Sequence, residues 1–587
     1  MKIKGGDFLI KKTIASSIFI PEQWNEEQLM LKKMIHDFLE KEILSLKEEP
    51  QASKDLNFIV ELLEKSAKLG LCGLSIEQKY GGTDLDFNTS LLFNEAMAKG
   101  FSFATTIGAH VSIGSLPIVY YGTKHQKEKY LPKIATAEIK TAYALTEPNA
   151  GSDANSGKTK ATFDNKNKNF LINGQKMWIT NAGFADLFIV FAKIENDKNL
   201  SAFIVERKFG GITFSEEEKK LGIKGSSTRQ VFFTNCPVPE QNLLGKREEG
   251  FKIALNILNS GRIKLAAGAI GGSKFALDKA IQYSIERKQF GKSICEFTAM
   301  QYKIGEMARK IFAAESAIYR TGKNIDNKEI ELKKNKCPEN EIKLKALREF
   351  AIECALMKVY SSEVLDYCVD ESLQMHGGMG YSVETGVEMG YRDARITRIY
   401  EGTNEINRML AFGELIKRSF KTKEINLKAA GAKIPLSLIK QFFKIGKLTT
   451  EKVIENYKNL FLILSKFSAD AFGLDLEHEQ EIIMNLSDIM GEIYVAESVY
   501  LRVERLKEIN IHSTDLVNKE NLTRLQLYEA NLKILQCANN IADSLPNTRN
   551  KLLRFYIRIL TPQPILNPTK TRRSLAKQLI EKKHYSW

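Results

Sequence analysis

Hydrophobic positions along the chain change their spacing from one region to the next. In the first region they recur at helical spacing, as in Glu26–Leu44, which predicts amphipathic helices. Between about Thr141 and Pro239 they form short runs of β-branched and aromatic residues bounded by Gly, Asn and Asp, which is typical of strands. Helical spacing then returns and continues towards the C-terminus. The pattern therefore predicts a helical region, a β region and a second helical region, in that order.

This order predicts an α+β chain with an N-terminal helical domain, a central antiparallel β domain (sandwich or barrel), a helical bundle domain and an appended C-terminal helical domain. The expected bounds are 1–140, 141–240, 241–420 and, including a Lys-rich linker, 421–587. A chain of 587 residues is too long for one ordinary core. Within the β domain, Asn173-Gly174 is a hairpin turn signal.

Composition narrows the class of protein. Hydrophobic residues make up 43% of the chain and charged residues 27%, as in soluble globular proteins. No apolar run reaches the roughly 20 residues that a membrane-spanning helix needs. Met1–Ile20 lacks both the apolar stretch of a signal peptide and the Arg-rich pattern of a transit peptide. We therefore expect a cytoplasmic protein.

Cysteine, histidine and charge patterns argue against several kinds of site. The seven cysteines are scattered with no Cys-x-x-Cys pair, and the seven histidines form no helical pair of the zinc type, so neither a disulfide framework nor a metal site is expected. The net charge of +15 comes from lysines interleaved with glutamates, without a nucleic-acid-binding motif. We expect no nucleic-acid partner.

One run, Arg398–Ile406, has the features of a loop that meets a helix. It places Glu401 directly before Gly402 and Thr403. The glycine lets backbone and ligand approach closely, and Thr403 can cap the amphipathic segment Asn404–Lys417. Helix-terminal N–H groups favour anions such as a cofactor phosphate. Taken alone, the run is more typical of a helix cap or of a glutamate in solvent than of a catalytic site.

Four further motifs accompany this run. Their sequences are YALTEPNAGSD from Tyr143, KMWITNA from Lys176, ERKQFGK from Glu286 and QMHGGMGY from Gln374. Together, and in this order, the five motifs resemble the acyl-CoA dehydrogenase family of flavoproteins over roughly residues 20–420. The helical extension beyond residue 420 resembles the very-long-chain branch of that family, which favours long acyl chains as substrates.

The resemblance implies an FAD-dependent α,β-dehydrogenation of acyl-CoA thioesters to trans-2-enoyl-CoA, as in fatty acid β-oxidation, with electrons passed to an electron-transfer flavoprotein. Its catalytic base would be Glu401, which takes the α-proton. Some relatives carry the base on the helix that holds the CoA-binding arginine. That position is Gly261 here, which has no side chain, so Glu401 is the expected base.

The resemblance also implies two sets of binding residues, which Ser152 and the Glu401 loop would share. FAD would contact Tyr143, Leu145, Thr146, Gly151, Ser152, Trp178, Ile179, Thr180, Arg287, Phe290, Gln374, Gly377, Gly378, Thr403 and Glu405. Acyl-CoA would contact Ser152, Asn259, Arg262 and Gly402. Because Arg287 and Phe290 would reach the cofactor of a neighbouring subunit, a homodimer is expected.

Three alternatives stay open at this stage. An acyl-CoA oxidase would use the same carboxylate but let O2 reach the reduced flavin. A non-catalytic assembly scaffold could be built on the same fold. The basic, amphipathic segment Ile434–Lys447 could lie on an anionic membrane surface, as a peripheral contact at the inner face of the membrane, or pack against a dimer partner.

Overall fold

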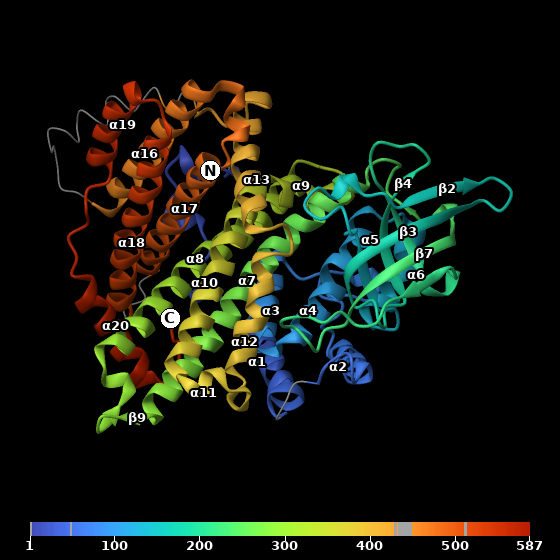
Figure 1. Cartoon of the computed structure of the whole chain (residues 1–587), viewed down its shortest axis with the longest axis horizontal. Helices are drawn as coiled ribbons and strands as arrows, with labels where there is room; N and C mark the ends of the chain where they lie inside the picture. Colours follow the sequence, from blue (N-terminus) through green and yellow to red (C-terminus); the bar gives the residue numbers. More distant parts are fainter. Residues whose placement is uncertain (1–2, 47–49, 428–430, 432–448, 510–513) are drawn as a thin grey trace.

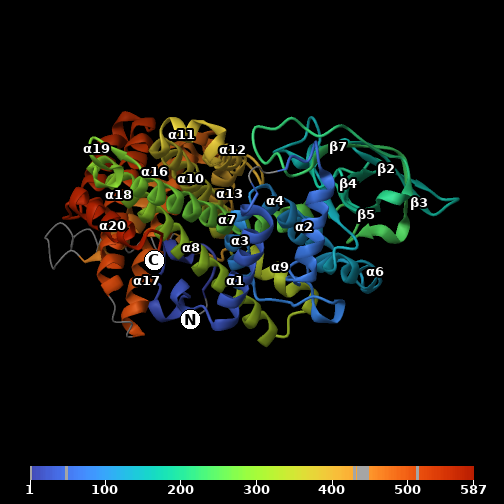
Figure 2. The ribbon, with the colours of Figure 1, turned by 90° about the horizontal axis from the view of Figure 1, so that it is seen from below.

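Long helices form the centre of the molecule, with a β-sheet at one end and the C-terminal helices at the other (Figures 1 and 2). The structure is a computed structural model, and it describes residues 3–46, 50–427, 431, 449–509 and 514–587. The predicted order of helical, β, helical and appended helical regions is confirmed. The exact domain bounds stay predictions. The predicted helix Ile434–Lys447 lies outside the described residues.

The described helices fall into three groups along the chain. The N-terminal group is α1 (Glu26–Leu39), α2 (Leu56–Lys68), α3 (Phe87–Met97), α4 (Ser102–Ala109), α5 (Leu116–Tyr121) and α6 (Lys124–Ala135). The central group is α7 (Gly250–Glu286), α8 (Thr298–Lys334), α9 (Glu339–Glu349), α10 (Ala351–His376), α11 (Gly378–Tyr381), α12 (Val387–Ala394) and α13 (Asn404–Ile416). The C-terminal group is α16 (Thr450–Phe472), α17 (Gln480–Glu508), α18 (Thr514–Ser544), α19 (Asn547–Leu560) and α20 (Pro568–Lys582).

One helical stretch, Ser102–Tyr121, is by length and composition apolar enough to cross a membrane, but 78% of its most apolar window is buried inside the protein. It consists of α4, the π-helical turn η7 (His110–Gly114) and α5. The expectation that no run reaches this length was wrong. Its serines, threonines and glycines interrupt the apolar pattern without making the helix strongly polar, so the run is hard to see in the sequence.

The β domain is one eight-stranded sheet in the order β6-β7-β3-β2-β4-β5-β8, with β1 paired to β4. Its strands are β1 (Thr141–Ala144), β2 (Lys160–Asp164), β3 (Asn169–Thr180), β4 (Leu187–Ile194), β5 (Ser201–Glu206), β6 (Ile212–Phe214), β7 (Thr228–Pro239) and β8 (Leu243–Leu244). A separate short hairpin, β9 (Lys288–Gln289) with β10 (Lys292–Ser293), follows α7.

Two details of this sheet differ from expectation. Most pairs are antiparallel, as predicted, but β1 and β2 each run parallel to β4. The predicted hairpin at Asn173-Gly174 was wrong, because both residues lie within the continuous strand β3. The register against β7 shifts between Ile172 and Gly174, so the glycine marks a bulge instead of a turn.

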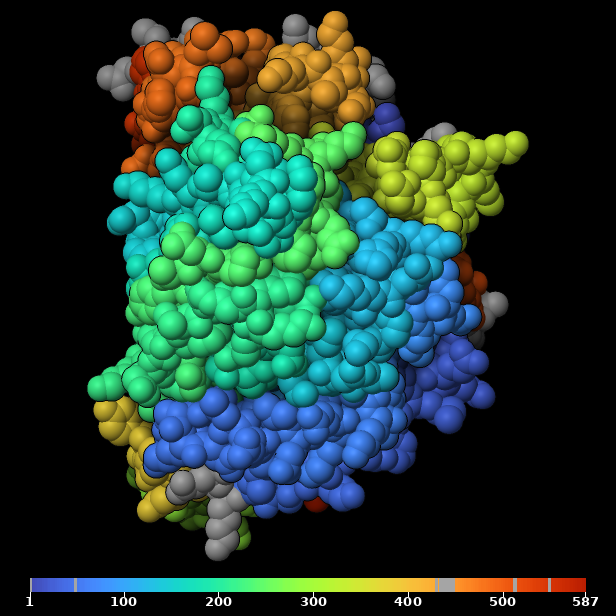
Figure 3. All heavy atoms as spheres, turned by 90° about the vertical axis from the view of Figure 1, so that its right-hand side faces the viewer, coloured from blue at the N-terminus to red at the C-terminus, as the bar shows by residue number. Residues whose placement is uncertain are grey.

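The N-terminal helices and the β domain lie directly against each other, as the space-filling view shows (Figure 3). Asn181 Nδ2 donates to the carbonyl oxygen of Thr106 at 3.1 Å, and Gly225 N donates to Ser102 Oγ at 3.1 Å. On strand β4, one face joins an apolar cluster with these helices and with α7, while the other face joins the core of the sheet itself. This packing holds the ends of β1 and β3 beside the central helices.

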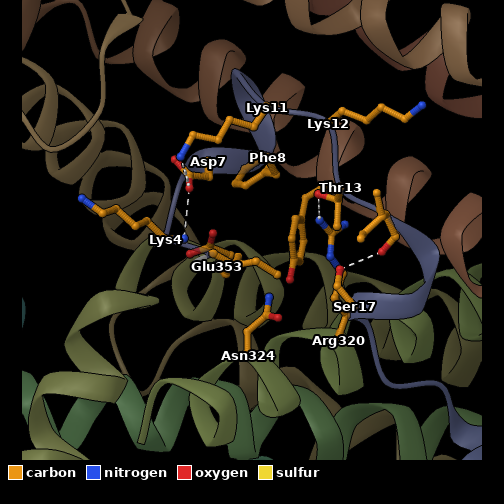
Figure 4. Close-up of a pocket in the computed structure, with 13 residues that line it drawn as sticks. Lys4, Asp7, Phe8, Lys11, Lys12, Thr13, Ser17, Arg320, Asn324 and Glu353 are labelled. Carbon is orange, nitrogen blue, oxygen red and sulfur yellow. Dashed lines mark hydrogen bonds and ion pairs between the residues drawn. The ribbon is translucent and has the colours of Figure 1, made fainter. Parts of the chain in front are cut away.

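A segment before α1 is anchored in the central bundle (Figure 4). Gly6 N donates to Glu353 Oε1 at 2.8 Å, while Glu353 Oε2 is buried with no hydrogen-bond partner in the described residues. Within the part of the chain that the structure describes, Asn324 Oδ1 is also buried without a partner. It lies beside a cavity of about 20 Å³, room for about one water molecule. Burial raises the pKa of Glu353 to about 7.

We expect Glu353→Gln to make the free energy of unfolding less dependent on pH. The folded-state pKa of about 7 lies above the ordinary value of 4.5, so this carboxyl stabilises the fold below pH 4.5 and loses that effect as pH rises through 7. At pH 8 the variant should be more stable than the parent by on the order of 3 kcal/mol, measured by chemical denaturation. At pH 5 the difference should shrink to below about 1 kcal/mol. An equal difference at both values would contradict this account.

Candidate functional site

Glu401 sits in a left-handed turn that leads directly into α13. The φ angles of Glu401 and Gly402 are 59° and 82°, and Thr403 caps the helix by accepting a hydrogen bond from Ile406 N at 3.3 Å. The predicted loop-to-helix junction is therefore confirmed. A non-glycine residue in this conformation costs roughly 1–2 kcal/mol, so surrounding contacts must hold it.

Three side chains from three helices donate hydrogen bonds to the carbonyls of this turn. Arg262 Nε of α7 lies 3.2 Å from the Glu401 oxygen, and Lys358 Nζ of α10 lies 2.8 Å from the Gly402 oxygen. Asn407 Nδ2 of α13 lies 3.3, 2.7 and 3.0 Å from the carbonyl oxygens of three consecutive turn residues. The conformation of the turn therefore depends in part on Arg262 and Lys358, which lie far away in the sequence.

The Glu401 carboxyl lies against Gly261 of α7. A Cβ atom at Gly261 would stand only 2.6 and 2.9 Å from the two carboxyl oxygens. Glu401 Oε2 is buried and has no hydrogen-bond partner in the described residues. The position at which some relatives carry a base thus provides the space that the Glu401 side chain uses.

Burial raises the pKa of Glu401 to about 7, and the nearby positive charges of Arg262 and Lys358 oppose this shift. Neither cation makes an ion pair with the carboxyl in the described residues, because both donate to backbone carbonyls instead. A group with a pKa near the working pH is suited to take up a proton and release it again.

A cavity of about 700 Å³ extends from Glu401 along one face of α7. The stretch from Gly261 to Lys279 spans about 27 Å at a helical rise of 1.5 Å per residue. Small residues keep this wall open, and the opposite wall comes from α3, α4 and the segment before Glu401. Lining residues from α7 are Gly261, Lys264, Leu265, Gly268, Ala269, Gly272, Phe275, Ala276 and Lys279, and those from α4 include Ala104, Thr105, Gly108 and Ala109.

The end of β3 reaches this cavity at Thr180, and the end of β1 lies next to β3. Met177 N donates to the Thr146 oxygen at 2.9 Å, which joins the two strand ends. Thr180 lines the cavity, while Trp178, with φ of 61°, leaves 53% of its surface exposed. An exposed indole beside a wide cavity offers a stacking surface for a flat aromatic ring system. These residues therefore fit a flavin.

The other predicted residues of this part of the site occupy varied positions. Tyr143 and Leu145 are buried along the end of β1, and Ile179 is buried in the core of the sheet. Gly151 and Ser152 are exposed in the loop after β1, and Glu405 is exposed in the first turn of α13.

Two of the four predicted CoA-contacting residues bond to each other. Arg262 Nη1 donates to Asn259 Oδ1 at 2.8 Å, and both side chains are buried. Gly402 lies beside them, because a Cβ at Gly402 would stand 3.7 Å from Arg262 Nη2. Asn259, Arg262 and Gly402 are thus brought together, whereas Ser152 lies on the β domain.

The remaining predicted cofactor residues gather at the opposite end of α7. Arg287 caps that end, and Phe290 in the following hairpin is 93% exposed. Tyr283 stacks on His376 with ring centroids 4.2 Å apart, which places the end of α10 nearby, with Gln374, Gly377 and Gly378 exposed. Gly261 and Arg287 are about 39 Å apart along the helix. The two clusters of predicted residues therefore lie at opposite ends of α7.

Sequence reasoning missed several buried polar residues around the site. Lys358 and Asn407 hold the Glu401 turn, and Lys264 lines the cavity without a hydrogen bond in the described residues, its pKa lowered to about 8 by burial. Glu147 and Lys176 form a buried ion pair of 2.7 Å beneath the loop after β1. For Lys358, Lys264 and Lys176, the one available signal was a lysine at an apolar position of a helix or strand.

Family comparisons cover most of the chain. Residues 25–138, 142–236 and 248–414 match the N-terminal, middle and C-terminal domains of acyl-CoA dehydrogenases, and residues 456–552 match a further acyl-CoA dehydrogenase C-terminal domain. The matched segments follow the helical, β, helical and appended helical order of the fold.

Individual relatives agree with these matches. A probable acyl-CoA dehydrogenase of Bacillus subtilis is 42% identical over 506 residues, covering 86% of this chain and 85% of that protein. The human very long-chain specific acyl-CoA dehydrogenase, a mitochondrial protein, is 38% identical over 399 residues, covering 66% of this chain and 58% of that one. A crystal structure of an acyl-CoA dehydrogenase complexed with FAD from Bacillus anthracis matches with a TM-score of 0.95 and 38% identity over the whole of both chains.

We expect Lys176→Met to destabilise the protein by about 3–5 kcal/mol, because it leaves the buried carboxylate of Glu147 without its cation. The measurement is the free energy of unfolding in denaturant. The double variant Glu147→Gln/Lys176→Met should recover part of the loss, since no unpaired charge remains. Lys160→Met, at an exposed position of β2, is the matched control and should change stability by less than about 0.5 kcal/mol. A similar effect at both lysines would refute the role of the ion pair.

Proposed function

The chain belongs to the acyl-CoA dehydrogenase family, and from this premise we propose that it is an FAD-dependent enzyme acting on long-chain acyl-CoA thioesters. It would convert them to trans-2-enoyl-CoA in fatty acid β-oxidation and pass the electrons to an electron-transfer flavoprotein. The observation that carries the proposal is the buried Oε2 of Glu401 at the wall of the cavity, which has no hydrogen-bond partner among the described residues.

Glu401 Oε2 is the atom that would take the α-proton of the bound thioester. Its raised pKa of about 7 makes the carboxylate a stronger base than an exposed glutamate, and an apolar acyl chain in the cavity would exclude water and strengthen this effect. Arg262 and Asn259 would bind the CoA portion beside the turn. Because both cations near Glu401 are engaged by backbone carbonyls, the carboxylate stays free for the substrate.

FAD would supply the hydride acceptor that no amino-acid side chain provides. Trp178 and Thr180 would hold its ring system beside the cavity. Arg287 and Gln374 would bind the dinucleotide portion of FAD in a second copy of the chain, because they lie at the far end of α7. The proposal therefore includes a homodimer. The electron-transfer flavoprotein as acceptor is supported by the family resemblance.

The preference for long chains is supported by the dimensions of the cavity. Its α7 wall continues for about 27 Å from Gly261. The hydrocarbon core of a bilayer is roughly 30 Å thick, so the long acyl chains of one leaflet fill a depth of about 15 Å. The cavity therefore has room for a long extended acyl chain. The similarity to very long-chain specific relatives points the same way.

We expect Glu401→Gln to retain FAD but to lose substrate oxidation by a factor of roughly 10² to 10⁴, because the amide cannot accept the α-proton. The measurement is bleaching of the flavin absorption by acyl-CoAs of increasing length, without oxygen. Glu424→Gln, an exposed carboxylate outside the site, is the control. Equal bleaching in Glu401→Gln would remove this residue as the base.

The same measurement on the parent protein separates the alternative functions. Oxygen consumption by the parent on adding substrate would identify an oxidase, and no bleaching with any thioester would favour a scaffold.

We expect a leucine on either wall of the cavity to shift the best substrate towards shorter chains. A Cβ at Gly268 would make only an ordinary contact of 3.7 Å, and at Gly108 it would meet nothing within 4 Å, so both variants should fold. Gly268→Leu and Gly108→Leu should lower kcat/KM for long acyl-CoAs by tenfold or more while retaining activity on short ones. Gly413→Leu, on an exposed face of α13, is the matched control. An unchanged chain-length profile would show that this cavity does not hold the acyl chain.

A further inference from the structure

We propose that Lys358 is a positioning residue for Glu401, fixing the turn that aims the carboxyl and stabilising its charged form. This inference rests on the proposed function of Glu401 as a base. Lys358 Nζ lies 2.8 Å from the Gly402 oxygen and 2.8 Å from Asn404 Oδ1. The Lys358 amine of α10 therefore hydrogen-bonds both to the turn and to the first residue of α13.

The turn needs such support because of its conformation. Glu401 and Gly402 are both left-handed, and a left-handed glutamate persists only where its surroundings fix it. Asn404 Nδ2, which follows the turn, donates to Ser362 Oγ of α10 at 3.1 Å. Lys358 and Ser362 lie one helical turn apart on α10, and both hydrogen-bond to Asn404 at the start of α13.

Hydrogen bonding alone does not explain why this residue is a lysine. Lys358 is fully buried, and a buried ammonium costs far more free energy than a buried amide that makes the same bonds. Asn407 shows the cheaper solution, since its neutral amide donates to the same Gly402 oxygen. The positive charge of Lys358 therefore calls for a second role, and Glu401 is the carboxylate that favours this charge most strongly.

The charged groups around Lys358 give the direction of this effect. Burial lowers the pKa of Lys358 to about 7, the carboxylates of Glu401, Glu405 and Glu363 raise it, and Arg262 lowers it. In return, Lys358 and Arg262 lower the pKa of Glu401. The two groups therefore titrate as a coupled pair. Removing the amine should make Glu401 harder to ionise, so catalysis should require a higher pH.

Three variants of the FAD-loaded enzyme separate the two roles. Lys358→Met removes both hydrogen bonds and the charge, Lys358→Gln keeps a donor without the charge, and Asn407→Ala weakens the turn without changing any charge. We expect kcat to fall at least tenfold in Lys358→Met and less in Lys358→Gln, with KM changed by less than about threefold, because ground-state binding is retained.

The pH dependence of kcat/KM is the decisive measurement. In the parent it should fall as pH drops through about 7, where Glu401 takes up a proton. In both Lys358 variants, the pH at which kcat/KM falls (the acidic limb of the profile) should be higher by about one pH unit. This is the shift expected when a carboxylate loses a nearby cation. Asn407→Ala should lower kcat with the limb unmoved. A merely structural lysine would not shift the limb.

Amide hydrogen exchange in the flavin-free chain gives a readout that needs no activity. The segment 400–406 should exchange faster in Lys358→Met and Asn407→Ala than in the parent. If Lys358→Met does not fold, Lys358→Gln carries the pH test. A limb unmoved in the Lys358 variants would overturn the inference, as would unchanged exchange together with unchanged kcat. A parent that oxidises no acyl-CoA would instead defeat the proposed function, while the exchange measurement would still test the turn.

Discussion

The carboxyl of Glu401 is buried against α7 at Gly261, which has no side chain, and the other features of the site accommodate this contact. Gly261 leaves the space, and without it the carboxyl would have to point elsewhere. Burial raises the pKa of the carboxyl, so the same contact that places the group also makes it a stronger base. Holding a glutamate in a left-handed turn then requires donors from α7, α10 and α13.

Helix α7 links parts of the site that are otherwise far apart. Asn259 and Arg262 lie near its beginning, Gly261 faces the base, and small residues beyond it border the long cavity. Its last turn carries Arg287 to the second cluster of predicted cofactor residues. A rigid helix fixes these distances at 1.5 Å per residue. The length of the cavity and the spacing of the two clusters of predicted cofactor residues are therefore both set by α7.

The added C-terminal helices are joined to this frame by buried charges as well as by apolar packing. Arg502 of α17 is almost fully buried, lying 2.6 Å from Glu315 of α8 and 2.9 Å from Glu22 near the N-terminus. Such a network adds little net stability compared with apolar packing, but it strongly disfavours any arrangement that leaves one member unpaired. It therefore specifies how the N-terminal segment, the central bundle and the C-terminal helices fit together.

The sequence by itself determined the order of helical and β regions and the helix cap at Thr403, because these depend on spacing and residue type within short segments. Glu401 as the expected base came from the resemblance of its motifs to a known family. It misassigned Asn173-Gly174, since the same dipeptide serves a turn or a bulge and only pairing with β7 decides which. Only the tertiary structure showed that Lys358 supports the turn and that burial raises the pKa of Glu401. Burial and contact between distant helices are properties of the packed chain, and no local pattern encodes them.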